Sequence, residues 1–208
     1  MHIFLWWVGV GLVLGTVFAS FFEWVVHRYV MHRRLGPFAT PFRQHALVHH
    51  RVFQADTTYH LLRKEDRGTV PMAWWNGPAL VAIMQIPIVP AAWLSGQWGF
   101  LCGTSLAGCF YYTTYEYIHW CMHIPRQRQV ERNGIFFRLN GHHLLHHRYM
   151  GKNFNVVLPL ADWCLGTLLV RSHLRFAQAL GSSVPDVQPL GKRVPASKVR
   201  PIDDGRSR

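Results

Sequence analysis

The sequence predicts an all-α fold: an integral membrane helical bundle of about three spans, with a cytoplasmic helical cap that carries a histidine-ligated dimetal site. Two observations lead to this prediction. Half of the 208 residues are hydrophobic and only 15% are charged, and fourteen histidines outnumber the ten acidic residues. The net charge of +12 does not indicate nucleic-acid binding, because a basic chain this apolar and this rich in tryptophan more often faces a membrane.

Three apolar runs are long enough to cross a bilayer, which needs about 20 residues. They cover residues 3–22, 73–94 and 98–118. The first run has no charge, and it lacks the basic segment and cleavage site of a secretory signal, which is the alternative interpretation. The second run contains three prolines that predict kinks, Pro78, Pro87 and Pro90. The third run is charged only at Glu116, near its end.

The basic residues test this topology. With three spans, all 22 lysines and arginines fall on one side, as do thirteen of the fourteen histidines. The positive-inside tendency makes that side cytoplasmic. We therefore expect an integral membrane protein with its metal site on the cytoplasmic face. A compact chain without a retention signal favours the bacterial inner membrane over the endoplasmic reticulum.

The remaining segments are shorter or more polar. Residues 156–170 are apolar but too short to span, so we expect them to pack along the membrane interface or against the cap. Residues 1–180 are expected to form one membrane-embedded domain, and residues 181–208 a basic, disordered tail. The four cysteines form no CxxC pair and are expected to be reduced, packed thiols: Cys102, Cys109, Cys121 and Cys164.

Eleven histidines form four clusters at helical spacing. The clusters are His27 with His32, then His45, His49 and His50, then His119 with His123, and finally His142, His143, His146 and His147. Residues four apart share a face of an α-helix, so such pairs can bind one ion. Adjacent histidines point about 100° apart, which suits two ions better than one. In the last cluster the imidazoles are expected to converge on ions, while Leu144 and Leu145 pack on the opposite side.

Neutral imidazole suits zinc, copper, iron and nickel. Eleven clustered histidines are more than the four ligands that a structural zinc needs. The number is better explained by two ions, each with about five imidazole ligands and an open coordination position. Glu23 and Glu116 precede His27 and His119 by four and three residues. Each could fix the tautomer of a ligand or simply be a charge at a helix end. Two histidines outside the clusters, His2 and His60, are expected to have no metal role, and His173 is unassigned.

The ordered set HX4H, HX3HH, HX3H and HX2HH resembles the fatty acid hydroxylase superfamily of membrane di-iron oxygenases, which includes fatty acyl and sphingolipid hydroxylases, sterol desaturases and carotenoid hydroxylases. The stretches YEYIHWCMH and NFNVVLPLADWCLGT look like its third histidine box and its closing segment. The resemblance covers about residues 20 to 170. Two features depart from the pattern: the box with His45 has three intervening residues where many members have two, and many members have four spans.

The resemblance implies ten metal ligands in two shells. One shell would hold His27, His45, His49, His143 and His146, and the other His32, His50, His119, His123 and His147. The spacing leaves His142 as an alternative to His143, because His142 with His146 and His147 repeats the spacing of the second cluster. We take His143 as the ligand, since it matches the commoner box, and His142 as its neighbour.

The implied function is hydroxylation or desaturation of an unactivated C–H bond in a lipid such as a fatty acyl chain or sterol. The cofactors would be two iron ions, which zinc could replace in a preparation, with O2 as co-substrate. No catalytic side chain beyond the ligands is expected. Because no GxGxxG is present, a separate donor protein, a small haem or iron–sulfur protein with its reductase, would supply electrons. A metal-transport protein and a b-type cytochrome are alternatives, but both predict histidines inside the spans.

Overall fold

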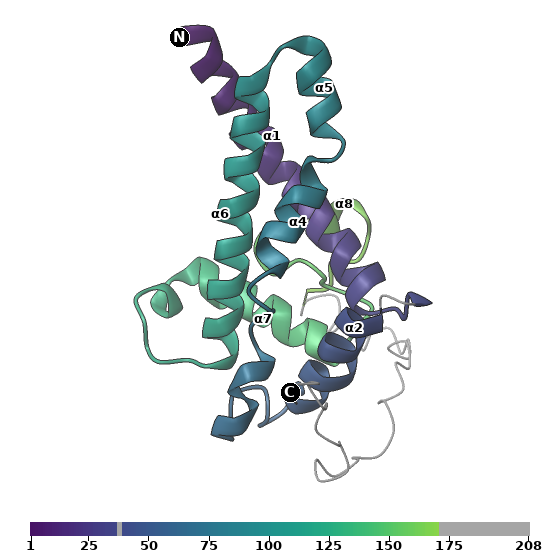
Figure 1. The fold of residues 1–208 in the computed structure, drawn as a ribbon. Coiled ribbons are helices and arrows are strands. Elements are labelled where there is room, and N and C mark those ends of the chain that lie inside the picture. The colour runs from purple at the N-terminus through teal and green to yellow at the C-terminus, as the bar shows by residue number, and fades with distance from the viewer. Residues whose placement is uncertain (37–38, 171–208) are drawn as a thin grey trace, which may run out of the picture.

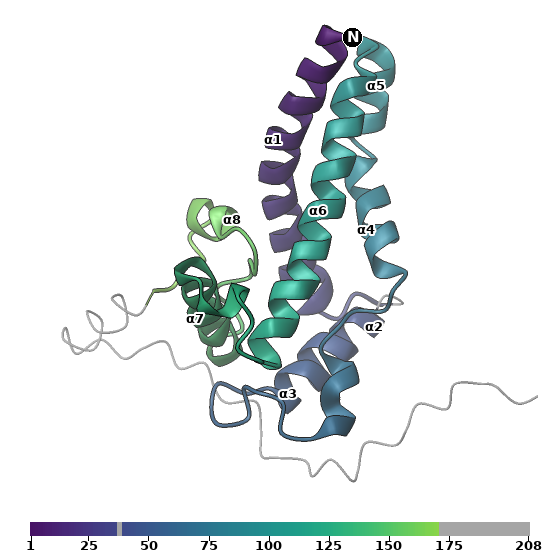
Figure 2. The same cartoon turned by 90° about the vertical axis from the view of Figure 1, so that its left-hand side faces the viewer.

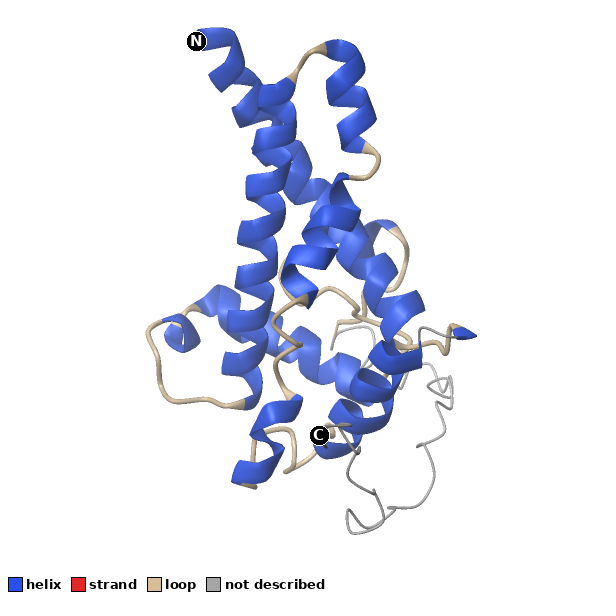
Figure 3. Ribbon diagram, in the orientation of Figure 1, coloured by secondary structure: helices blue, strands red, loops and turns tan. Residues whose placement is uncertain are grey.

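The computed structural model describes residues 1–36 and 39–170. These residues form helices and connecting loops, with no strand among them, so the predicted all-α class is confirmed for the described part (Figure 3). The expected tail at residues 181–208 and His173 lie outside the described residues.

The long axis of the molecule is a helical bundle. Helix α1 (His2–Val25) and helix α6 (Trp98–His123) run side by side over most of their lengths (Figures 1 and 2). Helices α4 (Asn76–Gln85) and α5 (Ile88–Ser95) precede α6 in the sequence and pack against it. Helix α1 continues without a break into a π-helical segment, η1 (Val26–Met31). The N-terminus and the α5–α6 turn share one end of the bundle.

Small residues bring α1 and α6 into backbone contact. They recur every four residues on both helices, as Gly11, Gly15 and Ala19 on α1 and as Gly99, Gly103 and Ala107 on α6. A Cβ atom added to Gly103 would lie 2.2 Å from the Val8 carbonyl oxygen, and one added to Gly11 would lie 2.5 Å from that of Phe100. Small residues at this spacing are what allow membrane helices to approach so closely.

The number of membrane-length helices is smaller than the sequence predicts. Among the described residues, one helix is long and apolar enough to cross a bilayer, His2–Met31. The pair α4 and α5 reaches the same criterion only together, as a span bent by 48°. Helix α6 has 26 residues and lies along α1, but its polar residues keep it below that hydropathy. The structure therefore contains one such helix, or two with the bent pair, against three predicted.

Only one of the three prolines breaks a helix. The bend between α4 and α5 falls at Ile86 and Pro87. Pro78 and Pro90 lie in the first turns of their helices, where the missing backbone N–H has no partner to lose. The predicted kink is thus confirmed at Pro87, whereas the other two prolines begin helices.

The end of the bundle opposite the N-terminus carries the remaining helical elements (Figure 1). Helix α7 (Gly134–Arg148) begins at Asn133, whose side chain accepts a hydrogen bond of 2.8 Å from the Ile135 N–H. Around it lie α2 (Ala39–Phe42), η3 (Arg43–His49), α3 (His50–Val52), η4 (Lys64–Thr69), η5 (Val130–Arg132) and α8 (Leu160–Cys164). We call this end of the molecule the cap.

The 156–170 segment and the cysteines differ from expectation in detail. The segment contains α8 and packs against the lower half of α1, where the Ser20 hydroxyl donates to the Leu158 carbonyl at 2.7 Å (Figure 2). The four cysteines are free, but only Cys121 is buried; Cys102, Cys109 and Cys164 are exposed. The expectation of packed thiols was therefore wrong for those three, because no side chain of the described residues covers them.

We expect Gly103→Ala to weaken the α1–α6 contact, because the new methyl group meets the Val8 carbonyl. Overpacking of this kind costs about 1–3 kcal/mol, measurable as a lower free energy of unfolding in detergent. Gly9→Ala is the matched control, since a Cβ atom there meets nothing within 4 Å. Equal stability of the two variants would contradict the packing described here.

Candidate metal centre

Two π-helical segments place the first histidine clusters. His27 lies in η1, and His45 and His49 lie in η3. The π-helix hydrogen bonds residues five apart, as the His32 N–H does to the His27 carbonyl at 3.1 Å. The wider turn brings residues five apart onto nearly one face. His27 with His32, and His45 with His50, therefore lie close together.

The clusters converge into two groups of five imidazoles. In each group the five ligand nitrogens lie within 4.8 Å of one another. The His27 group consists of His27, His32, His45, His50 and His146, and the His119 group consists of His49, His119, His123, His143 and His147. The ten predicted ligands are the ten members of these groups. Neighbours in the sequence serve different groups, as the 100° offset between adjacent residues requires.

The division between the groups differs from the one implied by the resemblance. His32 and His50 join His27 and His45 instead of facing them, because the π-helical turns set residues five apart side by side. In the ordinary α-helix α7, His143 and His147 share a group at a spacing of four. The shells implied by the resemblance were therefore wrong in their membership.

Burial keeps these imidazoles neutral. Nine of the ten are buried, and His32 is partly buried. Burial lowers the pKa of His45, His49 and His50 well below the ordinary value of 6.5, and neighbouring imidazoles lower it further. Neutral imidazole is the form that binds metal ions. In α7 the four histidines are buried, whereas Leu144 and Leu145, expected to form a packing face, are only partly buried.

Backbone carbonyls orient five of the ten rings. Each of these rings donates its Nδ1–H to a carbonyl oxygen: His27 to Phe154, His49 to Thr69 at 3.2 Å, His123 to Tyr59 at 2.8 Å, His146 to Lys152 at 2.7 Å, and His147 to Phe53 at 2.6 Å. A hydrogen bond of this kind fixes the tautomer, because the proton stays on Nδ1. The Nε2 lone pair of each ring is then free to bind a metal ion.

The Nε2 atoms fit a metal ion better than they fit one another. His143 Nε2 lies 3.0 Å from that of His147 and 3.2 Å from that of His123, and both partners already hold their proton on Nδ1. The buried Nε2 atoms of His49 and His119 have no hydrogen-bond partner. A metal–nitrogen bond of about 2.0–2.1 Å separates ligands at right angles by about 3 Å. A cation at the centre of each group would therefore satisfy these nitrogens together.

The two glutamates do not orient ligands. Glu23 accepts hydrogen bonds from the Tyr111 hydroxyl at 2.6 Å and the Val156 N–H at 2.7 Å, and Glu116 accepts one from the Met72 N–H at 3.2 Å. The interpretation of these residues as ligand partners was wrong, because neither glutamate hydrogen bonds to a histidine in the described part of the chain, and the Phe154 carbonyl orients His27. His142 lies outside both groups, with Nε2 3.2 Å from the Asp162 carboxylate. Two further histidines of the described residues, His2 and His60, lie outside the clusters and are exposed.

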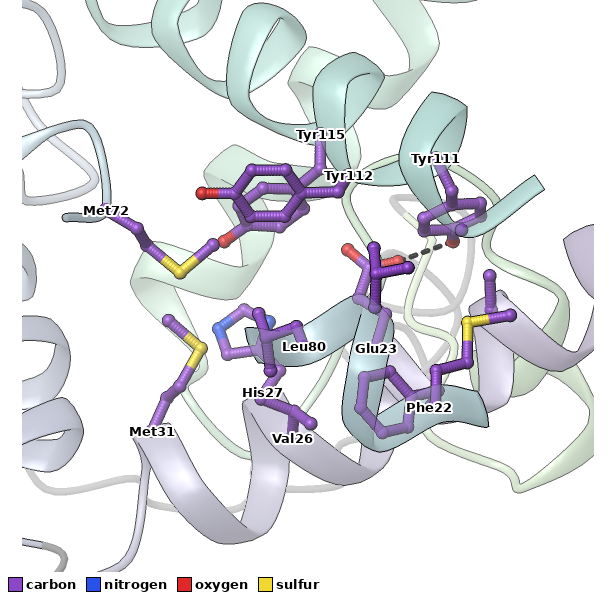
Figure 4. Close-up of a pocket in the computed structure, with 14 residues that line it drawn as sticks. Phe22, Glu23, Val26, His27, Met31, Met72, Leu80, Tyr111, Tyr112 and Tyr115 are labelled. Carbon is purple, nitrogen blue, oxygen red and sulfur yellow. Dashed lines mark hydrogen bonds between the residues drawn. The ribbon is translucent and has the colours of Figure 1, made fainter. Parts of the chain in front are cut away.

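An apolar pocket adjoins the metal centre (Figure 4). It lies between α1, α4 and α6, and the His27 imidazole lies in it beside Met31 and Met72. A second pocket shares part of the same lining, including Met31 and Met72, and reaches His45, His49 and His119. The two pockets together connect the interior of the bundle with imidazoles of both groups.

We expect the metal-free protein to lose stability as the pH falls. Below about pH 6.5 the unfolded chain protonates its histidines, while burial keeps the folded imidazoles neutral, so the unfolded state binds more protons. Each such group costs about 1.4 kcal/mol per pH unit below that value. The thermal midpoint of chelator-treated protein should be level above pH 7.5 and fall steeply towards pH 5. A flat profile would show that these rings are not buried in the neutral form.

Comparison with known proteins agrees with this geometry. No curated protein and no solved structure matches the chain. One family model matches, Fatty acid hydroxylase, over residues 12–167. The match covers more than half of the chain and includes both π-helical segments, both histidine groups and the apolar pocket between the long helices. The chain belongs to the fatty acid hydroxylase family.

Proposed function

We propose that this protein is a membrane-bound di-iron oxygenase that hydroxylates or desaturates an unactivated C–H bond of a lipid, such as a fatty acyl chain or a sterol. The observation that carries the proposal is the contact between the apolar pocket and the histidine groups, made by His27 in the first pocket and by His49 and His119 in the second. Bound iron supplies the activation of O2, which no amino-acid side chain can provide.

The residues of the chain hold the ions and position the substrate. Neutral, buried imidazoles bind metal without adding charge to an apolar site, and their carbonyl partners fix the ring planes. The pocket lining, with Val26, Leu80 and Met84, excludes water and accepts an aliphatic chain. Two of its polar side chains, Glu23 and Tyr111, hydrogen bond each other, so that the Tyr111 hydroxyl is satisfied within the pocket wall (Figure 4).

The same proposal includes the membrane arrangement. Helix α1, the bent pair α4–α5 and helix α6 would form three spans, and the cap would face the cytoplasm, where the lysines and arginines gather. Leu106 and Phe110 on the outer face of α6 are 51% and 75% exposed, which suits contact with lipid tails. A lipid chain could then pass from the bilayer to the ions. The bacterial inner membrane is the proposed location, and a separate donor protein the proposed source of electrons.

The competing functions fit less well. A metal transporter needs ligands along its path through the membrane, and a b-type cytochrome needs paired histidines within facing spans. The ten grouped histidines gather at one end of the bundle, where α1 and α6 meet the cap. This arrangement favours a fixed dimetal site over a conduction path or a haem between helices.

We expect purified, iron-loaded protein to hold about two irons per chain and to add one oxygen to a host lipid or remove two hydrogens from it. His146→Ala should reduce turnover at least about 100-fold and lower the iron content, because the His146 ring is fully buried in the His27 group. His60→Ala is the control, since His60 is exposed and outside both groups. Lipid mass spectrometry and elemental analysis give the two measurements. Fewer than about two metal ions per chain in the parent protein, or full turnover in His146→Ala, would contradict the proposal.

The pocket can be tested separately from the ions. A Cβ atom at Gly108 would lie 3.3 Å from the Met84 sulfur and 3.6 Å from Val81, so a leucine there would project into the pocket. Gly108→Leu should abolish turnover or shift it to smaller substrates while the metal content stays unchanged. Gly9→Leu, in open space on α1, is the matched control. Unchanged turnover and product pattern in Gly108→Leu would show that the substrate does not use this pocket.

A further inference from the structure

The two histidine groups receive their orienting carbonyls from two different loops. The His27 group is oriented by the carbonyls of Lys152 and Phe154, in the loop that follows α7. The His119 group is oriented by the carbonyls of Phe53, Tyr59 and Thr69, in the segment between α3 and α4. Each loop is held by its own side-chain contacts, so the two groups can be perturbed one at a time.

A single buried carboxylate organises the loop of the His27 group. Asp162, at 0% exposure, accepts four hydrogen bonds. Its Oδ1 accepts from the Phe154 N–H at 2.9 Å and the Thr167 hydroxyl at 2.6 Å, and its Oδ2 accepts from the Asn155 N–H at 2.7 Å and His142 Nε2 at 3.2 Å. No lysine or arginine is among these partners, so the charge is balanced by donors that the loop itself supplies.

One peptide group links this carboxylate directly to a ligand. The peptide between Phe154 and Asn155 donates its N–H to Asp162, and its carbonyl oxygen accepts the Nδ1–H of His27. Hydrogen bonds in such a chain polarise one another, so the carboxylate makes that carbonyl a stronger acceptor. A stronger acceptor raises the basicity of the imidazole that binds the metal ion. This is the arrangement of a carboxylate behind a ligand histidine, with a peptide group inserted between them.

Further contacts fix the same loop to the bundle. The Asn155 carboxamide accepts from the Asp162 N–H at 3.0 Å and donates to the Ser20 carbonyl at 2.8 Å. The Thr167 hydroxyl accepts from the Trp24 indole N–H at 2.8 Å. Asp162 therefore joins the loop to α1 one turn before His27, and this rigid attachment also positions the Lys152 carbonyl that binds His146.

We propose that Asp162 is the positioning residue of the His27 group, and that it controls retention of the metal ion in that group and not in the His119 group. The proposal rests on the dimetal site of the proposed function. Asp162 hydrogen bonds to none of the ten grouped histidines; three of its four donors lie in the segment after α7, and the fourth is His142 on α7.

The direct test is Asp162→Asn, which keeps the shape but removes the charge and turns one acceptor into a donor facing an N–H or O–H group. Chelator-resistant metal should fall from about two ions to about one per folded chain, with the remaining ion held as tightly as before. Loss of an orienting partner weakens metal binding about 10- to 100-fold. Asp66→Asn is the matched control for the His27 group, because Asp66 pairs with Arg63 in η4, which supplies an orienting carbonyl only to the His119 group.

Two double variants show which ion is lost. In His123→Ala, where the His119 group is already broken, adding Asp162→Asn should remove the remaining ion. In His146→Ala, where the His27 group is broken, adding it should change nothing. The opposite pattern, equal loss of both ions, or full retention of both would overturn the proposal. Metal retention can be measured with zinc and without turnover, so this test is independent of the lipid-oxidation test. If the parent protein bound no metal, that result would contradict the proposed function and not the role of Asp162.

A milder variant covers the case in which Asp162→Asn does not fold. Thr167→Val removes one hydrogen bond to Asp162 and leaves its charge in place. We expect a chelator to extract the ion of the His27 group several-fold faster from this variant, with the extraction rate of the other ion unchanged. Helical circular dichroism and gel filtration establish that the variant is folded. Equal extraction rates for both ions, relative to the parent, would overturn the proposal.

Discussion

The cap depends on one constraint: ten imidazoles with converging lone pairs form its interior. Five of them have their proton fixed on Nδ1 by a carbonyl, so at Nε2 each presents only a lone pair, and the buried Nε2 atoms of His49 and His119 have no hydrogen-bond partner among the described residues. A buried polar atom left without a partner costs about 1–3 kcal/mol. A metal ion in each group removes this cost for several atoms at once. In this half of the molecule the two histidine groups lie beside apolar clusters, such as the one formed by Phe53, Val70 and Ile124.

The bundle brings this polar interior next to an apolar pocket. The glycines on α1 and α6 allow the two backbones to meet, and both helices continue into histidines: α1 through η1 to His27, and α6 to His119 and His123. Helix α4 completes the pocket from the other side. An aliphatic chain that follows the bundle would reach the ions without leaving apolar surroundings, which is the property that lipid oxidation requires.

Spacing in the sequence predicted the four histidine clusters, and the family resemblance predicted the ten grouped histidines but not their division. A spacing of four identifies ligands on an α-helix, and it served well for His119 with His123. It failed where η1 and η3 adopt π-helical turns, because no residue type in those segments signals such a turn. The carbonyl partners could not be predicted either, because any residue can supply a backbone carbonyl. Glu23 and Glu116 were predicted as partners instead, because a carboxylate side chain can be recognised in the sequence. Asp162 stood out as the lone acid in an apolar run, but its partners lie in a loop whose path the sequence does not give.

Anomalous X-ray scattering at the iron edge, from crystals of the iron-loaded protein, tests the central claim most directly. Two separate peaks are expected. One should lie among His27, His32, His45, His50 and His146, and the other among His49, His119, His123, His143 and His147. A single peak, or an ion bound by His142 or by a glutamate in place of these rings, would contradict the account.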